Sequence, residues 1–449
     1  MKICLFGKFP PIQGGVSSLT YITAHRLAEN GNQVYVITNA NEVESCYKQY
    51  LDVEDFQKLE KQYFNGSVKV YNTSELAKYS FIPFSNPYSS KLLGLGFKVI
   101  NDLKPDLLIG WYFEPYGVVA SLLAKQFNIP CIIRHAGSDI RRLSQNIDLG
   151  EAYKLMLLNA NYLVTSFNSK SLNRIKELGI TSEKLLFVKG FRLPPYFSDN
   201  ASKLDINIWK NKAKLWFDTL QIDSALKIKL KDINSKTFDN TKTTIGIYGK
   251  VGQTKGSYDL IKVISDLAKE NLEFNFVIIA AGNYPALERF YSELIQNKYL
   301  ADRLFILPII ANWKIPSFIR SLDICCFLER DFSIEFHSPK IPFEILSSGQ
   351  CLVISKEIMI KNAYSDGFLD NENCIIVNPK EHEDFRNKLR NLINNPFLYK
   401  KIGRNGKLFF DLITESNNKN SVLFEDIIEE LKKLDSISES KFFYLQKPN

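Results

Sequence analysis

The chain has 449 residues, of which 45% are hydrophobic and 24% charged, and this composition excludes a disordered protein. Its length allows two α/β domains, each with its own core, while no apolar run approaches the ~20 residues of a membrane-spanning helix. The formal net charge of +8 favours an anionic partner such as a nucleotide, a nucleic acid or lipid headgroups. The basic residues are scattered rather than clustered, so we expect no nucleic-acid partner.

The cysteines and the first residues bear on the compartment. Seven cysteines is an odd number, most of them lie inside apolar strand patterns, and no pair has the spacing of a zinc site. They indicate reduced core residues in a cytoplasmic protein, without a metal centre. Met1 and Lys2 lead straight into a strand pattern, so we expect no secretory signal.

The first half of the chain alternates short apolar runs with helical periodicity. The expected strands are residues 2–7, 33–38, 68–71, 107–111, 131–136, 162–166 and 185–189. Helical patterns separate most of them, including 18–30, 117–127 and 169–178. Continuous β-branched runs between helices are typical of a parallel sheet covered on both faces, and such sheets bind ligands at the carboxyl ends of their strands.

Gly14 and Gly15 follow the first expected strand and precede a helix. Glycines at a helix N-terminus let a backbone approach a phosphate or a sugar closely. The dinucleotide fingerprint Gly-X-Gly-X-X-Gly is absent. A loop that merely turns the chain is the alternative.

Two further clusters, 111–116 and 134–139, lie at expected strand ends. His135 stands beside Gly137 in the second, although a lone His at a strand end is more often a structural hydrogen-bonding group than a catalytic one. Their other candidate side chains are Trp111, Glu114 and Asp139.

Residues 194–243 break this rhythm. Two prolines open a polar stretch, and residues 203–220 then have an amphipathic helical pattern with several lysines. Basic residues flanking tryptophan and leucine suit an anionic membrane surface, although a helix packed on its own domain fits the same pattern. We interpret 194–243 as an insertion or linker.

A second α/β series follows. Its expected strands are residues 244–249, 274–281, 304–309, 322–328, 351–355 and 374–377, and its expected helices are 258–269, 285–296, 316–321, 383–394, 396–414 and 422–434. Lys250 and Lys255 lie on a glycine-bearing loop at the end of the first of these strands. They could embrace a diphosphate, or they could be ordinary solvated surface charges.

The stretch from Ser338 to Gly349 is expected to form a helix between two strands. Ser338 suits the N-cap and Pro339 the first helical position, so free N–H groups would face a bound phosphate. Glu344, near the second turn, could accept hydrogen bonds from sugar hydroxyls. An ordinary strand–helix–strand unit with a surface glutamate fits equally well.

Together these motifs resemble a known family. The two Rossmann-like halves, the glycine pair, the Lys-Gly after the first strand of the second half and the Glu-bearing helix are similar to the retaining glycosyltransferases of the GT-B fold, in particular to group 1. The resemblance covers nearly the whole chain apart from 194–243 and the C-terminal tail. It implies two parallel-sheet domains facing across a cleft, with a C-terminal helix packed back on the N-terminal domain.

The resemblance also implies roles. Lys250 and Lys255 would neutralise the donor's diphosphate, Glu344 would bind the ribose of the nucleotide, and His135 would contact the transferred sugar. The donor side would further include Gly14, Gly15, Gly249, Ser338, Pro339 and Lys340, and the acceptor side Trp111, Glu114 and Asp139.

One position departs from the family pattern. The first glutamate of the family's two-glutamate motif falls on Phe336, and Glu335 is its neighbour. We expect Glu335 to take over the donor-sugar contact through a one-residue shift, and the alternative is a remodelled contact at Phe336.

The resemblance implies transfer of a sugar, with retention, from a nucleotide-diphospho-sugar to a glycan or lipid-linked acceptor, as in bacterial envelope polysaccharide synthesis such as lipopolysaccharide or capsule. Asp-X-Asp is absent from the sequence, so we expect no metal and no cofactor. A nucleotide-sugar epimerase or hydrolase on the same fold, or a non-catalytic partner subunit, remains the alternative.

The expected domains are 1–193 for the acceptor, 194–243 as insertion or linker, 244–420 for the donor, and 421–449 as C-terminal helix and tail. We expect a cytoplasmic enzyme, with possible peripheral contact to an anionic membrane at its inner face.

Overall fold

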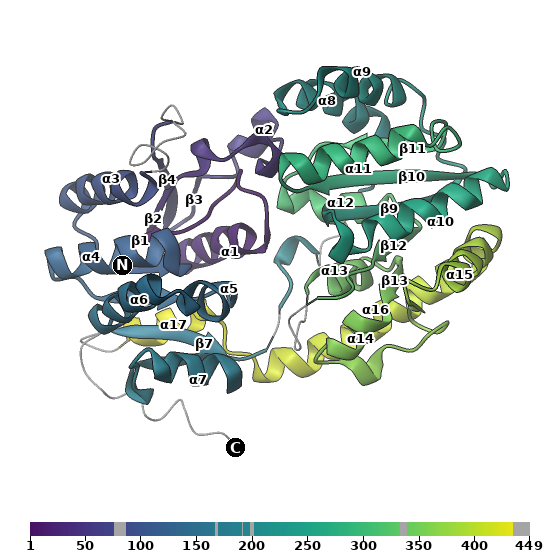
Figure 1. Cartoon of the computed structure of the whole chain (residues 1–449). Coiled ribbons are helices and arrows are strands. Elements are labelled where there is room, and N and C mark those ends of the chain that lie inside the picture. The colour runs from purple at the N-terminus through teal and green to yellow at the C-terminus, as the bar shows by residue number, and fades with distance from the viewer. Residues whose placement is uncertain (76–86, 167–168, 191, 198–201, 333–338, 434–449) are drawn as a thin grey trace. The chain divides into compact units, whose positions relative to one another are not determined.

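The computed structural model describes residues 1–75, 87–166, 169–190, 192–197, 202–332 and 339–433 (Figure 1). The chain divides into two compact units. The N-terminal unit is drawn from residues 1–43, 51–191 and 418–449, and the C-terminal unit from residues 44–50 and 192–417. Glu335, Phe336 and Ser338 lie outside the described residues.

Within the described residues, the N-terminal unit is built on an eight-stranded sheet of order β3-β4-β2-β1-β5-β6-β7-β8. Its strands are β1 (Lys2–Phe6), β2 (Gln33–Thr38), β3 (Lys61–Gln62), β4 (Ser67–Asn72), β5 (Leu107–Trp111), β6 (Cys131–Arg134), β7 (Tyr162–Ser166) and β8 (Leu185–Val188). All pair in parallel except the short edge strand β3. The parallel sheet predicted for this half is confirmed.

Helices cover both faces of this sheet. The helices are α1 (Gly15–Glu29), α2 (Val53–Phe56), α3 (Tyr88–Leu103), α4 (Val118–Phe127), α5 (Ser138–Arg141), α6 (Ile147–Asn159), α7 (Ser169–Glu177) and α17 (Phe424–Lys432). Alternate residues of each strand face opposite ways. Cys4 and Phe6 therefore pack with α3, α4 and α6, whereas Ile3 and Leu5 pack with α1 and α17.

The C-terminal helix α17 packs on the N-terminal unit, as the sequence predicted. Phe424 and Ile428 are buried in the same core as β1 and β5. The hydroxyl of Thr23 on α1 donates to the carboxylate of Glu425, and Asn32 donates to Glu429 over 2.9 Å. Apolar burial and paired polar groups together hold α17 against α1.

The C-terminal unit has, among its described residues, a six-stranded parallel sheet of order β11-β10-β9-β12-β13-β14. Its strands are β9 (Thr243–Lys250), β10 (Phe274–Ala281), β11 (Leu304–Leu307), β12 (Ile324–Phe327), β13 (Cys351–Ser355) and β14 (Ile375–Val377). Its helices are α8 (Ile206–Thr219), α9 (Ser224–Ile233), α10 (Ser257–Lys269), α11 (Tyr284–Gln296), α12 (Ile315–Arg320), α13 (Ile341–Ser347), α14 (Lys356–Lys361), α15 (His382–Asn394) and α16 (Pro396–Asn420).

The segment 194–243, which we interpreted from the sequence as an insertion or linker, contains the helices α8 and α9. α8 and α9 contribute Trp216, Phe217 and Leu230 to the main core of the C-terminal unit. The amide of Asn234 also donates to the carbonyl of Ile306 on β11 over 2.6 Å. This core continues through α8 and α9, so both helices pack on their own unit, which is the alternative that the sequence left open for residues 203–220.

A short segment of the first half, residues 44–50, also belongs to the C-terminal unit. The backbone N–H of Tyr50 donates to the carbonyl of Ile309 over 2.6 Å, and Gln49 donates to Asn312 over 3.0 Å. Cys46 is fully buried in the core of that unit. The chain therefore joins the two units at more places than a two-domain sequence pattern indicates.

The cysteines and the helices agree with two simple expectations. All seven cysteines are buried and free, which confirms the prediction of reduced core residues. Among the described residues no helix is long and apolar enough to cross a membrane.

Candidate functional site

The carboxyl ends of β9 and β12 mark the place where the strand order of the C-terminal sheet reverses. β9 is the first strand of this sheet along the chain, and it lies between β10 and β12. In doubly wound sheets ligands bind at such a place, outside the carboxyl ends of the strands. The loops that follow β9 and β12 therefore form the first candidate site.

The loop after β9 is fastened to the loop after β12. Gly256 has a φ of +66°, and a Cβ there would meet the carbonyl oxygen of Leu328 at 2.2 Å, so only glycine fits. The backbone N–H of Arg330 donates to the carbonyl of Thr254 over 2.9 Å. Thr254 lies in the short helical turn η7 (Gln253–Lys255), which directly precedes Gly256.

Lys255 ends this turn and forms an ion pair with the carboxylate of Glu329. The side chain of Glu329 is 7% exposed and that of Lys255 is 23% exposed. The ammonium group also lies 4.9 Å from the centre of the Phe332 ring, a cation–π contact. A positive charge is thus held in a defined position where the two loops meet.

Lys250 is the last residue of β9, and it is exposed. It follows Gly249, where a Cβ would lie 3.5 Å from Cδ1 of Ile341, the first residue of α13. The end of β9 therefore lies close to the start of α13. The joint action of Lys250 and Lys255 on a diphosphate stays a prediction.

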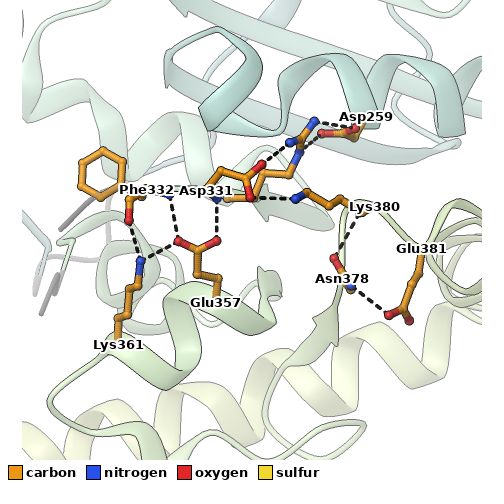
Figure 2. Close-up of polar contacts among 9 residues, drawn as sticks. Asp259, Asp331, Phe332, Glu357, Lys361, Asn378, Lys380 and Glu381 are labelled. Atoms are coloured by element: carbon orange, nitrogen blue, oxygen red, sulfur yellow. Dashed lines mark hydrogen bonds and ion pairs between the residues drawn. The ribbon is translucent and has the colours of Figure 1, made fainter. Parts of the chain in front are cut away.

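Ion pairs anchor the loop after β12 to neighbouring elements (Figure 2). The guanidinium of Arg330 donates to Asp259 on α10 over 2.7 and 3.2 Å and to Asp331 over 2.6 Å. Lys380 lies 2.7 Å from the second oxygen of the Asp331 carboxylate. A planar guanidinium bound on two sides has little freedom to move, so Arg330 fixes this loop rather than serving a ligand.

A second anchor comes from α14 (Figure 2). The carboxylate of Glu357 accepts the backbone N–H groups of Asp331 and Phe332 over 2.6 and 2.9 Å. Lys361, one turn further along α14, donates to Glu357 and to the carbonyl of Phe332, each over 2.6 Å. Side chains of α10 and α14 therefore define the path of the loop up to Phe332.

α13 starts later than the sequence predicted. Its N-cap is Lys340, and Pro342 lies in its first turn; Pro339 precedes the helix. With Pro339 as the first helical residue, Pro342 would fall at the fourth position, where it could not donate the first intrahelical hydrogen bond. The start predicted at Ser338 and Pro339 was therefore wrong. Gly349, with a φ of +72°, follows the helix as predicted.

Glu344 lies on α13 and is paired with a residue of β9. The hydroxyl of Tyr248 donates to Oε2 of Glu344 over 2.7 Å. Burial raises the pKa of the Glu344 carboxyl, and the Tyr248 hydrogen bond and the charge of Lys340 offset part of this shift. A carboxylate has about four acceptor positions, so Glu344 can still accept hydrogen bonds from hydroxyls of a ligand.

In the N-terminal unit the equivalent loop lies between β1 and α1. Gly14 is the N-cap of α1 with a φ of +123°, and no atom of the described residues lies within 4 Å of a Cβ built at Gly14 or Gly15. The ammonium of Lys8 lies 4.7 Å from the centre of the Tyr112 ring, which follows β5. Space for a ligand remains beside this backbone.

His135 follows β6 and is held by neighbouring groups. Its Nε2 lies 2.8 Å from the hydroxyl oxygen of Thr165, and the backbone N–H of Gly137 donates to its Nδ1 over 3.2 Å. Because Nδ1 accepts, the neutral ring carries its proton on Nε2 and donates it to Thr165. A contact with the transferred sugar stays a prediction.

Asp139 is fully buried and acts within the protein. Its carboxylate accepts backbone N–H groups of Ala136, Ile140 and Phe113 over 3.0 to 3.2 Å. Burial raises the pKa of Asp139, and these hydrogen bonds offset part of that shift. Asp139 ties the loops after β5 and β6 together, and its contact with an acceptor stays a prediction.

Trp111 is likewise buried, with 1% of its surface exposed. The guanidinium of Arg134 stacks over its ring at 4.1 Å, and the Phe424 ring lies 5.7 Å away. This aromatic surface supports α17, so Trp111 is not available to an acceptor in this structure.

Glu114 is the acceptor-side candidate that remains partly exposed. It lies in the turn η3 (Phe113–Gly117), and the hydroxyl of Ser89 on α3 donates to its Oε1 over 3.1 Å. Burial raises the pKa of this carboxyl. Its contact with an acceptor stays a prediction.

Two residues of the site were missed by sequence reasoning. Tyr248 lies in an otherwise apolar strand, where its hydroxyl needs a partner, and Glu329 follows a buried strand directly. A charged residue directly after a buried strand is a signal that could have indicated Glu329. Its pairing with Lys255 could not be predicted, because Lys255 is 74 residues away in the chain.

Comparison with known families decides the class of the protein. The family model "Glycosyl transferases group 1" matches residues 229–409, and the model "Glycosyl transferase 4-like" matches residues 2–168. The chain belongs to the group 1 glycosyltransferases. The two models match one part in each half of the chain, as the predicted two-domain resemblance requires. No curated protein matches the sequence.

Solved structures agree with the GT-B fold of this family. Anabaena HepE in complex with UDP-glucose has a TM-score of 0.57 at 14% identity, covering 97% of this chain and 100% of HepE. Sucrose-phosphate synthase from Thermosynechococcus elongatus has a TM-score of 0.57 at 12% identity, covering 96% and 99%. WaaG, a glycosyltransferase involved in lipopolysaccharide biosynthesis, has a TM-score of 0.51 at 10% identity, covering 93% and 99%.

Proposed function

We propose that this group 1 glycosyltransferase moves a sugar from a nucleotide-diphospho-sugar to a glycan or lipid-linked acceptor, with retention of the anomeric configuration. The proposal includes a role in bacterial envelope polysaccharide synthesis. The observation that carries it is the ammonium of Lys255, held where the loops after β9 and β12 meet. This is where a nucleotide ligand binds in a sheet of this topology.

The chemistry needs a positive charge at this place. When the bond between C1 of the sugar and the diphosphate breaks, negative charge grows on the leaving diphosphate. A fixed cation stabilises that charge as it develops, without reorganisation during the reaction, and such stabilisation is commonly the largest catalytic contribution. Lys255 supplies this cation in our proposal, and the exposed Lys250 on the same loop supplies a second.

The nucleotide is proposed to bind along the C-terminal unit, with Glu344 accepting hydrogen bonds from the ribose. Glu344 and Tyr248 lie on α13 and β9, and β9 leads directly into the loop that carries Lys255. HepE structures contain UDP and UDP-glucose, so UDP is the first nucleotide to test. A thermal-shift screen with UDP, GDP and ADP identifies the base, because a ligand that binds only the folded state raises its stability.

Turnover with and without an acceptor separates transfer from its rivals. We expect donor consumption to depend on an added glycan or lipid-linked acceptor, and nuclear magnetic resonance of the product to show the anomeric configuration of the donor. Rapid epimerisation or hydrolysis of the donor without acceptor would favour the rival enzyme class. Tight donor binding with no turnover on any acceptor would favour a non-catalytic subunit.

The reaction is proposed to need neither a metal ion nor another cofactor. The basis is the absence of Asp-X-Asp from the sequence, together with two lysines that can neutralise the diphosphate. Transfer should survive exhaustive EDTA treatment. Complete loss of activity that Mg²⁺ or Mn²⁺ restores would contradict this.

We also propose that the enzyme works in the cytoplasm, in peripheral contact with an anionic membrane through α8. Ile208 and Leu215 on this helix are 53% and 65% exposed, and Lys212 lies over the ring of the buried Trp209 at 4.3 Å. Apolar side chains beside lysines suit an interface with anionic lipids.

Co-sedimentation at low salt tests the membrane contact. The protein should bind vesicles containing phosphatidylglycerol but not purely phosphatidylcholine vesicles. Ile208→Ser with Leu215→Ser should abolish binding, whereas Leu408→Ser, at an equally exposed position of α16, should not. Absence of binding at low salt, where electrostatic attraction is strongest, would reject the contact.

A further inference from the structure

Lys255, which we propose to bind a phosphate, forms an ion pair with the carboxylate of Glu329, and this is an unusual partner for a phosphate-binding lysine. The carboxylate belongs to the loop after β12, is almost completely buried, and lies against the ammonium that the proposed function assigns to the donor's diphosphate. A carboxylate repels a phosphate, so its presence needs a reason. Its effect on the position of Lys255 supplies one.

The backbone carbonyl of Glu329 and the residues before and after it are all held by contacts with neighbouring elements. The hydroxyl of the fully buried Ser355, at the end of β13, donates to the carbonyl of Glu329 over 2.6 Å. The preceding residue, Leu328, lies against Gly256, and the following residue, Arg330, is bound to Asp259 and to the carbonyl of Thr254. The carboxylate of Glu329 is therefore presented from a rigid loop.

A lysine side chain without such a partner occupies many rotamers. Ordering it upon binding costs conformational entropy, and a ligand that meets an already ordered ammonium does not bear that cost. Glu329 and the Phe332 ring restrict the ammonium of Lys255 from two directions. Lys255 keeps 23% of its side chain exposed, so a ligand can still reach it.

We propose that Glu329 is a positioning residue, which holds the ammonium of Lys255 ready for the diphosphate of the donor. This inference rests on the proposed function, because it requires Lys255 to contact the diphosphate. Glu329 itself touches neither the donor nor the acceptor. Its contribution passes entirely through Lys255.

A double-mutant cycle on the full-length protein tests this dependence. The affinity for UDP is measured by calorimetry for the wild type, Glu329→Gln, Lys255→Ala and the double variant. Glutamine keeps the size of the side chain and removes its charge. We expect Glu329→Gln to weaken UDP binding about tenfold in the wild-type background, and to have no further effect once Lys255 is alanine.

Glu357→Gln is the matched control. Glu357 supports the same loop through Asp331 and Phe332, but it pairs with Lys361 rather than Lys255. Because Phe332 also contacts Lys255, the dependence of any Glu357→Gln effect on Lys255 should be smaller than that of Glu329→Gln. Glu329→Asp, which keeps the charge and shortens the reach, should retain part of the affinity and replaces Glu329→Gln if that variant does not fold.

The outcomes separate the inference from the proposed function. Equal weakening by Glu329→Gln in both backgrounds would show a merely structural role, and unchanged or tighter UDP binding by Glu329→Gln would show that the carboxylate opposes the ligand. Either result would overturn the positioning role while the diphosphate site stands. If Lys255→Ala alone leaves UDP affinity unchanged, the assignment of Lys255 to the diphosphate fails, and the inference fails with it.

Discussion

The loop after β1 and the loop after β9 have the same topological place in two sheets but are built differently. Each follows the first strand of its sheet, precedes a helix, and has a lysine near an aromatic ring of the loop across the strand reversal. In the N-terminal unit the pair is Lys8 with Tyr112. In the C-terminal unit it is Lys255 with Phe332, and there the buried Glu329 is added.

The two loops also differ in the space around their glycines. In the part of the chain that the structure describes, a Cβ at Gly14 or Gly15 would meet no atom within 4 Å, whereas one at Gly256 would collide with the carbonyl of Leu328. The C-terminal loop is thus closed against its neighbour and presents a fixed side chain. The N-terminal loop leaves its backbone open. We infer that the loop after β9 holds a constant part of the substrate, the diphosphate, and that the loop after β1 accommodates a variable part.

Removing the fixed charge should have the largest effect. Lys255→Ala and Lys250→Ala should each reduce the transfer rate about 100-fold, since losing one group that stabilises a developing anion costs about 3 kcal/mol. The melting temperature of Lys250→Ala should change little, because Lys250 is exposed at the end of β9. That of Lys255→Ala should fall, because the nearly buried carboxylate of Glu329 loses its ion pair with Lys255. Lys8→Ala is the corresponding change in the N-terminal loop and should have a smaller effect on the rate. Near-normal turnover by both C-terminal variants would remove this loop from the diphosphate site.

A glycine-to-alanine substitution should affect stability differently in the loop after β9 and in the loop after β1. Gly256→Ala should lower the free energy of unfolding by about 2 kcal/mol, because it combines a positive φ with a backbone collision. Gly15→Ala has neither problem and should stay within about 0.5 kcal/mol of the wild type. Chemical denaturation followed by circular dichroism measures both. Equal stability of the two variants would contradict the proposed difference between the loops.

The affinity for UDP should depend on pH through Glu344. Burial raises the pKa of this carboxyl above its ordinary value of 4.5, and the ionised form accepts stronger hydrogen bonds from the ribose hydroxyls than the protonated form does. Affinity should therefore fall as the pH is lowered through the raised pKa. In Glu344→Gln this part of the pH dependence should be absent, while the part due to protonation of UDP remains. Identical pH profiles of the two proteins would contradict the ribose assignment.

The raised pKa of Glu344 also affects the stability of the protein, and this effect changes with pH in the opposite direction to the affinity for UDP. Because the pKa of Glu344 is higher in the folded state, the folded protein binds more protons than the unfolded chain between the ordinary and the raised pKa. The contribution of Glu344 to stability therefore decreases as the pH rises through this window. Glu344→Gln should be free of this decrease, which denaturation at several pH values measures.

Tyr248→Phe should have the smallest effect. It removes one hydrogen bond to Glu344, worth about 0.5–1.5 kcal/mol, so UDP binding should weaken about fivefold. Tyr291→Phe is the matched control, since the buried hydroxyl of Tyr291 has no hydrogen-bond partner among the residues that the structure describes. A loss of affinity in Tyr291→Phe as large as in Tyr248→Phe would show that the effect is not specific to Glu344.

The sequence was sufficient for what depends on local pattern. Runs such as 33–38 and 351–355 are apolar except for polar residues at their ends, and the strands they form coincide with the prediction. Similar runs placed Lys255 in the loop after β9 and Glu344 on the helix between β12 and β13. Contacts between distant residues were not accessible in this way. The buried partners of Asp139, the placement of residues 44–50 and the pairing of Glu329 with Lys255 all depend on segments that folding brings together.

Titration of the wild type and of Lys255→Ala with UDP and with UMP tests the central claim most directly. The two ligands share base and ribose and differ in the second phosphate, so the ratio of their affinities isolates the interaction with the diphosphate. The wild type should prefer UDP strongly, and Lys255→Ala should lose most of this preference while binding UMP as before. An unchanged preference for UDP in Lys255→Ala would contradict the account.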